Sequence, residues 1–472
     1  MPTMSTSTLA AAPLPRALAP RTLALLQAPI LPLLLRLSAP NLAVMLAQAS
    51  TGLIETAFVG RLGTDALAGM ALVFPGFMLM QMMSAGAVGG AISSAIARAL
   101  GGGRRDDADG LAFHAMVINV LLGLAFTAIG LFAGPALYRA LGGEGPVLDA
   151  ALRYSNVIFG GAILLWLFNG LASCLRGTGN MQLPALITCG GVALLVPLSP
   201  CLIFGLGPFP ALGVAGGGVA LLIYYLAGGS VMLWHVATGR SVITIGAVPL
   251  RAATLWVILK VGLLAALISI QTNLVVSLTT VQVAAFGPGA LAGYGTGSRL
   301  EYLLVPLVFG LGAPLMALVG TNLGAGQRSR ALRATWVGAA LAFALTEAVG
   351  LVAAAWPGAW LHLFGDDPAM IAAGSVYLRN VGPFYGFFGL GMALYFASQG
   401  AGRLLWPLAG AVLRMVIAVA GGWAAMRLTG TLQAMFLALG AGLVAMGAVN
   451  TIAVAAGAWF PRRRVYTRSP GP

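Results

Sequence analysis

The sequence predicts an all-α membrane protein in which twelve transmembrane helices form two pseudo-symmetric lobes of six helices, as a parallel repeat. Three observations support this prediction. Of the 472 residues, 59% are hydrophobic and 8% are charged, whereas about 25% of the residues in a soluble domain are charged. The apolar residues fall in twelve stretches that are long enough to span a bilayer. Short motifs of the first half also return in the second half.

The twelve spans are separated by short polar breaks. A transmembrane helix needs about 20 predominantly apolar residues. The predicted spans are residues 37–59, 66–97, 112–138, 151–174, 184–206, 213–236, 255–284, 290–321, 334–356, 374–399, 405–426 and 432–459. Because Pro75, Pro306 and Pro314 lie inside long stretches, we expect tilted or kinked helices there.

The basic residues predict the orientation in the membrane. Eighteen of them lie in one alternating set of loops and tails, and four lie in the opposite set (Arg61, Arg139, Arg153 and Arg427). Cytoplasmic loops carry the excess of lysine and arginine. We therefore expect a multi-pass protein of the plasma (inner) membrane with both termini in the cytoplasm.

An internal repeat relates the two halves at an offset of 223 or 224 residues. The matching segments are Ala66–Gly69 with Ala290–Gly293, Gly101–Arg104 with Gly324–Arg328, Leu175–Pro184 with Ser398–Pro407, and Gln48 with Gln271. Six spans per half bring both halves into the membrane from the same side, with a binding site near the mid-bilayer. The predicted segments are a cytoplasmic tail (1–36), the N-lobe (37–239), a cytoplasmic linker (240–254), the C-lobe (255–460) and a basic cytoplasmic tail (461–472).

Three of the eleven acids, Glu55, Glu301 and Glu347, lie inside apolar stretches, and the other eight lie in polar breaks. An ionisable group at membrane depth is costly and marks an ion or substrate pathway by default. Glu301 has two readings, an interhelical salt bridge or a part in cation binding. Glu347 is either a structural hydrogen-bonding group or a functional acid. Arg414 is a candidate partner for either of these two acids.

The run from Gln48 to Gly63, which contains Glu55 and Thr56, is followed by Ala66–Gly69, and together they resemble the first two helices of the multidrug and toxic compound extrusion (MATE) transporters. The stretches 176–184 and 324–326 are similar to short cytoplasmic loops of that family, and the likeness covers roughly residues 30–460. The resemblance implies two six-helix lobes in a V, which export amphipathic, often cationic compounds against entering Na⁺ or H⁺. It also places the family's first-helix acid at Glu55, where aspartate is usual.

The choice of coupling ion rests on Glu55, Thr56, Asn169 and Ser199, the candidate ion-coupling residues. The sequence departs from the family at Leu195 and Ser199 in the fifth span, where Asn or Asp is common, and it lacks the seventh- and tenth-span acids of one branch. A hard cation needs several oxygen ligands, whereas a proton needs one carboxyl group. We therefore favour H⁺ over Na⁺, with Glu55 binding the proton and shifting its helix. The alternative is that Glu55 reaches the outer interface or pairs with Arg61.

The candidates for lining the substrate cavity are polar, aromatic or soft side chains at membrane depth. They are Gln48, Gln271, Asn273, Tyr294, Glu301, Tyr385 and Met392. Aromatic rings and thioethers suit lipophilic cations. For each of these residues, hydrogen bonding or packing between helices is the competing interpretation.

The composition also bears on other classes of function. The three histidines lie far apart without an HExxH pattern, and the three cysteines show no CxxC spacing, so we expect neither an enzyme nor a metal site. Arginines spread over loops argue against nucleic-acid binding. We expect a monomeric antiporter without a cofactor, in contact with the bilayer and a small amphipathic substrate. A lipid or oligosaccharide flippase of the same architecture is the alternative, and it predicts several basic residues within the spans.

Overall fold

The computed structural model describes residues 18–460, and this part of the chain is helical, without a strand. The predicted basic tail 461–472 and the first 17 residues lie outside the described residues. The N-lobe contains α2 (Ile30–Gly60), α3 (Thr64–Gln81), η1 (Met82–Val88), α4 (Gly89–Gly101), α5 (Arg105–Ala140), α6 (Gly145–Gly160), α7 (Ala162–Gly177), α8 (Gln182–Phe204) and α9 (Val214–Ala237). A short helix α1 (Pro20–Gln27) precedes them.

The second half of the chain forms the C-lobe. Its elements are α10 (Ala252–Ala284), α11 (Pro288–Gly324), α12 (Arg328–Ala355), α13 (Pro357–Leu361), α14 (Pro368–Val381), η2 (Gly382–Phe384), α15 (Tyr385–Ala401), α16 (Leu405–Met415), η3 (Val416–Gly421), α17 (Gly422–Thr429) and α18 (Leu432–Ala455). Eleven helices of the described chain are long and apolar enough to cross a membrane, and the bent pair α6–α7 makes twelve. The predicted fold class is confirmed.

Helix interruptions lie at four places. The α6–α7 pair bends by 46° at Gly161, η1 and η3 are π-helical, and η2 is a 3₁₀ turn around Pro383. Pro75, Pro306 and Pro314 remain inside α3 and α11. π-Helical turns inside α-helices are frequent at functional sites, and η1 borders the cavity described below.

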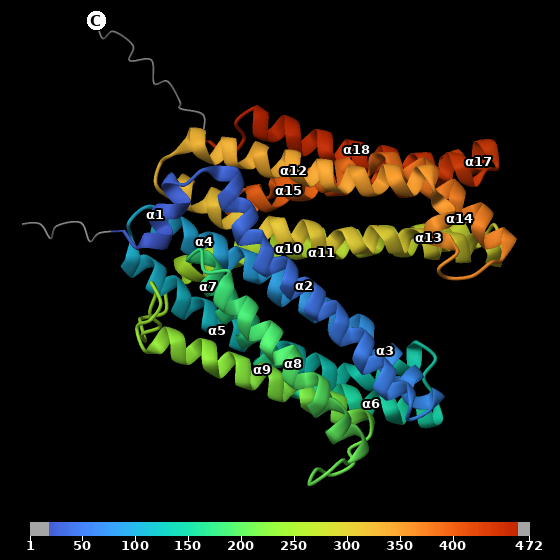
Figure 1. Cartoon of the computed structure of the whole chain (residues 1–472), viewed down its shortest axis with the longest axis horizontal. Coiled ribbons are helices and arrows are strands. Elements are labelled where there is room, and N and C mark those ends of the chain that lie inside the picture. Colours follow the sequence, from blue (N-terminus) through green and yellow to red (C-terminus); the bar gives the residue numbers. More distant parts are fainter. Residues whose placement is uncertain (1–17, 461–472) are drawn as a thin grey trace, which may run out of the picture.

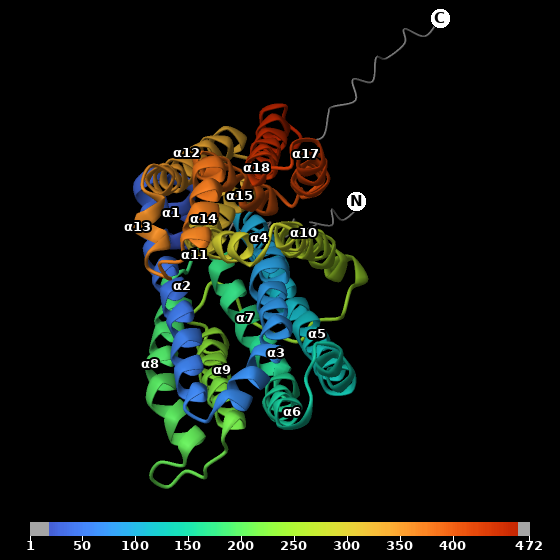
Figure 2. The ribbon, with the colours of Figure 1, turned by 90° about the vertical axis from the view of Figure 1, so that its right-hand side faces the viewer.

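The two lobes meet at one end and diverge toward the other, as Figures 1 and 2 show. At the joined end, the C-terminal parts of α4, α11 and α15 pack together, and we call this region the closed end. Arg98 of α4 donates to the carbonyl of Gly400 at 2.7 Å. Helix α1 docks on the same region, because Asn322 donates to the carbonyl of Leu25 at 3.1 Å. These contacts hold the two lobes together at the closed end.

A linker of residues 240–251 joins α9 to α10 and is held against α5. Asp109 accepts from the backbone N–H of Thr244 at 2.7 Å and from its hydroxyl at 3.0 Å. The backbone N–H of Arg251 donates to Nε2 of buried His114 at 2.9 Å, and His114 Nδ1 donates to the carbonyl of Gly110 at 2.7 Å. These bonds fix the connection between the lobes to the N-lobe.

Replacing Asp109 by alanine is expected to loosen this linker. A hydrogen bond to a charged group contributes roughly 1.5–3 kcal/mol, and about 1.4 kcal/mol corresponds to a factor of ten in the opened population. Trypsin should then cut after Arg240 or Arg251 about ten times faster, as quantified by mass spectrometry of the fragments. The control is Asp107→Ala, because Asp107 is exposed and pairs with Arg104 at 3.2 Å. Equal cleavage rates of the two variants would contradict the role of Asp109 in holding the linker against α5.

Candidate functional site

Two adjoining cavities lie at the membrane depth of Glu55 and Gln48, one mostly within the N-lobe and one between the lobes. The N-lobe cavity measures about 360 Å³ and is lined by α2, α3, α6, α8 and α9, with Pro306 of α11. The central cavity measures about 230 Å³ and lies between the lobes, lined by α2, α3, η1, α4, α7, α11 and α15. The two share Met45, Gln48, Gln81 and Pro306, so they are adjoining parts of one space.

Glu55 of α2 is 7% exposed and lines the N-lobe cavity. Its Oε1 is buried without a hydrogen-bond partner in the described chain. The oxygen faces Gly217 of α9, where an added Cβ would lie 3.4 Å from it. Tyr154 and Tyr225 line the same cavity. An ionised carboxylate is costly in such a place, so this group is suited to take up and release a proton.

Arg61, which the sequence offered as an ion-pair partner of Glu55, does not contact the carboxylate. Arg61 lies over the ring of Phe58, 5.9 Å from its centroid, and forms no ion pair with Glu55 within the described residues. The carboxyl group thus points into the cavity rather than to a cation at the helix end.

The other three candidate ion-coupling residues are dispersed. Thr56 is exposed, and its hydroxyl donates to the carbonyl of Gly52 at 2.7 Å. Asn169 of α7 donates to Gln81 Oε1 at 2.9 Å and to Ser84 Oγ at 2.8 Å. Ser199 of α8 is buried, and its hydroxyl has no partner in the described chain. Only Thr56 lines a cavity together with Glu55.

Only some of the candidates for lining the substrate cavity border a cavity. Gln48 lines both cavities. Gln271 of α10 is 7% exposed, and both atoms of its amide lack partners in the described chain. Asn273 is exposed and donates to the carbonyl of Ser269 at 2.9 Å. Met392 packs against the hydrophobic core. Of these four residues, Gln48 alone borders the two cavities.

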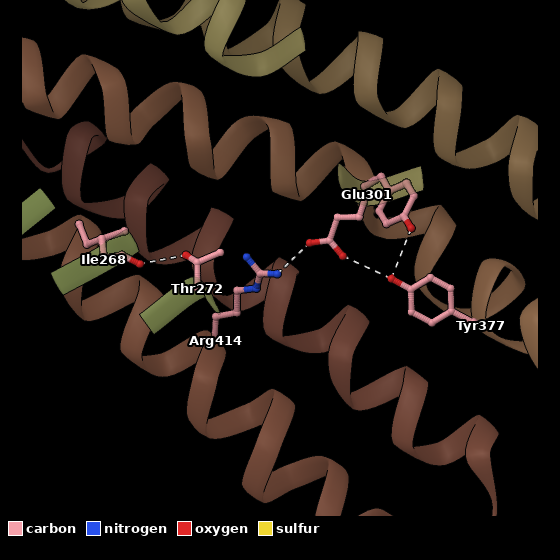
Figure 3. Close-up of polar contacts among 6 residues, drawn as sticks. Ile268, Thr272, Glu301, Tyr377 and Arg414 are labelled. Atoms are coloured by element: carbon pink, nitrogen blue, oxygen red, sulfur yellow. Dashed lines mark hydrogen bonds and ion pairs between the residues drawn. The ribbon is translucent and has the colours of Figure 1, made fainter. Parts of the chain in front are cut away.

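Glu301 belongs to a polar cluster inside the C-lobe, which Figure 3 shows. Arg414 of α16 donates to one oxygen of Glu301 at 2.9 Å, and the hydroxyl of Tyr377 donates to the other at 3.3 Å. The hydroxyl of Tyr385 lies 3.5 Å from that of Tyr377, and Tyr294 packs edge-to-face on the Tyr377 ring. The salt-bridge interpretation of Glu301 therefore matches its geometry. None of the five residues lines the two cavities.

Glu347 of α12 stabilises a helix start. Its Oε2 accepts from the backbone N–H of Gly386 at 2.6 Å, in the first turn of α15, where η2 interrupts the helix at Pro383. N–H groups at a helix start lack partners inside the helix, and a carboxylate is favourable there. This contact matches the structural interpretation of Glu347.

The sequence analysis missed five polar residues that line the central cavity. They are Asn41, Gln81, Ser93, Arg176 and Gln399. Arg176 and Gln399 occupy equivalent positions of the repeat, 223 residues apart, and this equivalence was the available signal. Asn41 and Gln81 lie in long apolar stretches, where a single amide carries no distinguishing pattern.

The closed end depends on glycines at which two backbones touch. A Cβ added to Gly324 of α11 would lie 2.1 Å from the carbonyl oxygen of Arg98 in α4, and one added to Gly101 would lie 2.0 Å from that of Thr321. No side chain fits at such distances, and small residues permit close helix contacts in membranes.

Gly324→Ala is expected to open the closed end. Overpacking costs roughly 1–3 kcal/mol, so the population with joined lobes should fall by about tenfold. Spin labels at the exposed residues Arg104 and Ser329 measure this as a longer, broader distance distribution. Gly229→Ala is the control, because its Cβ would meet nothing within 4 Å. An unchanged distribution in Gly324→Ala would refute the close contact.

Comparison with known proteins identifies the family. The MatE family model matches residues 40–201 and 265–424, once in each half. A FAD transporter of Shewanella oneidensis is 30% identical over 379 residues, covering 79% of this chain and 82% of that protein. A probable multidrug resistance protein NorM of Thermotoga maritima is 25% identical over 376 residues, covering 79% and 81%.

The fold agrees with this match. A crystal structure of a MATE protein in the bent conformation superimposes with a TM-score of 0.86 at 23% identity, covering 94% of this chain and 99% of that one. The sequence match in both halves, the helical membrane fold and the multidrug transporter relatives agree. The chain belongs to the MatE family of multidrug and toxic compound extrusion transporters.

Proposed function

We propose that this protein is an H⁺-coupled antiporter that exports amphipathic small molecules by alternating access, with Glu55 as the proton-binding group. One observation carries the proposal. Glu55 is the one acid among the residues that line the two adjoining cavities, and it is buried without an ion-pair partner in the described chain. Uptake of a proton removes the free-energy cost of the buried negative charge of Glu55. The neutral carboxyl group can also donate a hydrogen bond, so the contacts of this part of α2 change.

The arrangement of oxygen ligands supports H⁺ over Na⁺. A hard cation needs several oxygens around it. Of the other candidate ligands, Thr56 donates its hydroxyl to its own helix, and Asn169 donates to Gln81 and Ser84. Ser199 does not line the N-lobe cavity. These three candidates therefore do not surround Glu55 with oxygen ligands, whereas a proton needs only its carboxyl group.

Charge supports an orientation with the closed end in the cytoplasm. The closed end and the loops beside it contain Arg98, Arg104, Arg105, Arg328 and Arg330, in line with the excess of basic residues on the cytoplasmic side. The lobes then diverge toward the outside. We propose a monomer in the inner membrane with both termini in the cytoplasm, so that Glu55 takes up its proton from the outer side.

The transported molecule is either a cation or an anion. The family resemblance implies cations, whereas the Shewanella relative is named a FAD transporter, and FAD carries acidic phosphates. The flippase alternative predicts several basic side chains in the cavity, but Arg176 is the only one that lines the central cavity. Export of a small molecule is therefore the function that the site supports best.

Reconstitution into vesicles tests the coupling. Purified protein is placed in proteoliposomes, and accumulation of FMN and of ethidium is measured with either a pH gradient or a Na⁺ gradient at clamped pH. We expect dye movement with the pH gradient and none with the Na⁺ gradient. Transport that follows Na⁺ at clamped pH would overturn the choice of ion, and movement of both dyes without any gradient would overturn antiport.

A further inference from the structure

We propose that Arg176, at the closed end of the central cavity, forms an anion subsite that selects amphipathic organic anions with an aromatic body. This inference rests on the proposed export function and names its class of cargo. It differs from the cationic class that the family resemblance implies.

The charges around the two cavities carry the argument. All eleven acids of the chain lie in the described part, residues 18–460. Among the residues lining the two cavities, the only charged ones are Glu55 and Arg176. Glu55 lines the N-lobe cavity alone, so the central cavity contains a guanidinium and no carboxylate. Within the central cavity a cationic cargo would meet only a like charge, and a desolvated like-charge contact is costly.

The guanidinium of Arg176 has free hydrogen-bonding capacity. It donates to Ser173 Oγ at 3.0 Å and forms no ion pair within the described residues. An arginine carries five N–H donors in a planar fork, which matches the oxygens of a phosphate or carboxylate. The side chain is partly buried at the end of α7, so a bound anion would be shielded from water.

The repeat shows that this charge is specific to one lobe. The equivalent residue of the C-lobe is Gln399, which lines the same cavity. Its Nε2 donates to the carbonyls of Gly86 and Ala87 at 3.4 and 3.3 Å. Its Oε1 is buried and has no partner in the described chain. At this end of the central cavity, a cationic side chain from one lobe therefore faces the same space as a neutral amide from the other lobe.

The remaining lining fits a flat apolar body. Phe309 and Phe396 both line the central cavity, with ring centroids 4.8 Å apart and their planes at 82°. Met45, Met82 and Met316 add thioether surface, which adapts to aromatic rings. An acidic group at Arg176 and an aromatic system against these side chains therefore occupy different parts of one cavity.

Binding of FMN and riboflavin tests the proposal, because the two share an aromatic ring system and differ by one phosphate. Affinities are measured by flavin fluorescence with the full-length protein in nanodiscs, without any ion gradient. We expect the wild type to bind FMN at least about tenfold more tightly than riboflavin, as one charge-assisted contact implies. Arg176→Gln, which installs the C-lobe's own residue, should abolish the difference and leave riboflavin binding unchanged.

The controls separate this inference from the export mechanism. Arg299→Gln changes an exposed arginine outside both cavities and should leave both affinities unchanged. Arg176→Lys keeps a charge and should retain part of the preference, which provides a result if Arg176→Gln does not fold. Glu55→Gln should keep the preference for FMN over riboflavin even when transport is lost. Equal wild-type affinities for FMN and riboflavin, or tighter binding of ethidium than of FMN, would overturn the subsite.

Discussion

Glu55→Gln is expected to abolish export driven by a pH gradient, so that the export rate falls to the level measured without a gradient. The amide has nearly the size of the carboxyl group, so the packing against Gly217 and the cavity wall remains. What is lost is the group that binds a proton. Dye accumulation in proteoliposomes with an imposed pH gradient measures the rate directly.

The pH response gives a second measurement of the same variant. Export by the wild type should change with external pH at a constant gradient, because the protonated fraction of Glu55 changes. The rate of Glu55→Gln should show no such dependence. Glu55→Asp keeps an acid one methylene shorter and should retain part of the transport. Glu144→Gln removes an exposed acid and should transport at the wild-type rate. If Glu55→Gln exported dye at the wild-type rate, Glu55 would not be the coupling residue.

The membrane fold was predictable because the bilayer imposes one length on every span. Each predicted span overlaps a helix or a bent pair of helices in the structure. Helix starts were less accurate, since α2 begins at Ile30 rather than at residue 37. Hydropathy marks the apolar core of a helix, whereas polar and basic residues can extend it into the interface. The helix α1 lies within the predicted tail and is too short for hydropathy to mark it as a span.

The candidate site was predictable only where charge made a residue rare. Glu55 stands out because an acid in an apolar stretch is costly. The partners of Asn169, by contrast, lie on η1 and at the end of α3, 85 and 88 residues away in sequence. A π-helical segment has no compositional signature in this sequence, and it positions Ser84. Contacts between lobes, such as Gln399 with Gly86, depend on a tertiary arrangement that apolar patterns do not specify.

The repeat carried more information than the single motifs. It predicted two equivalent lobes, and it pairs Arg176 with Gln399 in the lining of the central cavity. It did not predict how the lobes differ. Glu55 and Arg176 lie in the N-lobe, while the buried ion pair of Glu301 and Arg414 lies in the C-lobe. This division suggests that the N-lobe provides the charges for transport, and that the polar interior of the C-lobe stabilises its helices.

Glu301→Ala is expected to destabilise the protein strongly, because it leaves the Arg414 guanidinium buried without its partner. The side chain of Glu301 is 20% exposed and that of Arg414 is 7% exposed, and a nitrogen of Arg414 lies 2.9 Å from an oxygen of Glu301. Breaking a buried pair on one side costs about 3–5 kcal/mol. Thermal unfolding in detergent, followed by size-exclusion chromatography, should show a clear fall in the melting temperature.

The double variant Glu301→Leu with Arg414→Met distinguishes a structural pair from a transport group. Replacing both charges by apolar side chains of similar size is often neutral or stabilising, so its melting temperature should return close to that of the wild type. Tyr377 then loses one acceptor but keeps its contact with Tyr385 at 3.5 Å. If the pair only joins α11 to α16, the double variant exports dye at the wild-type rate. A stable double variant that cannot transport would instead assign Glu301 and Arg414 to the transport cycle.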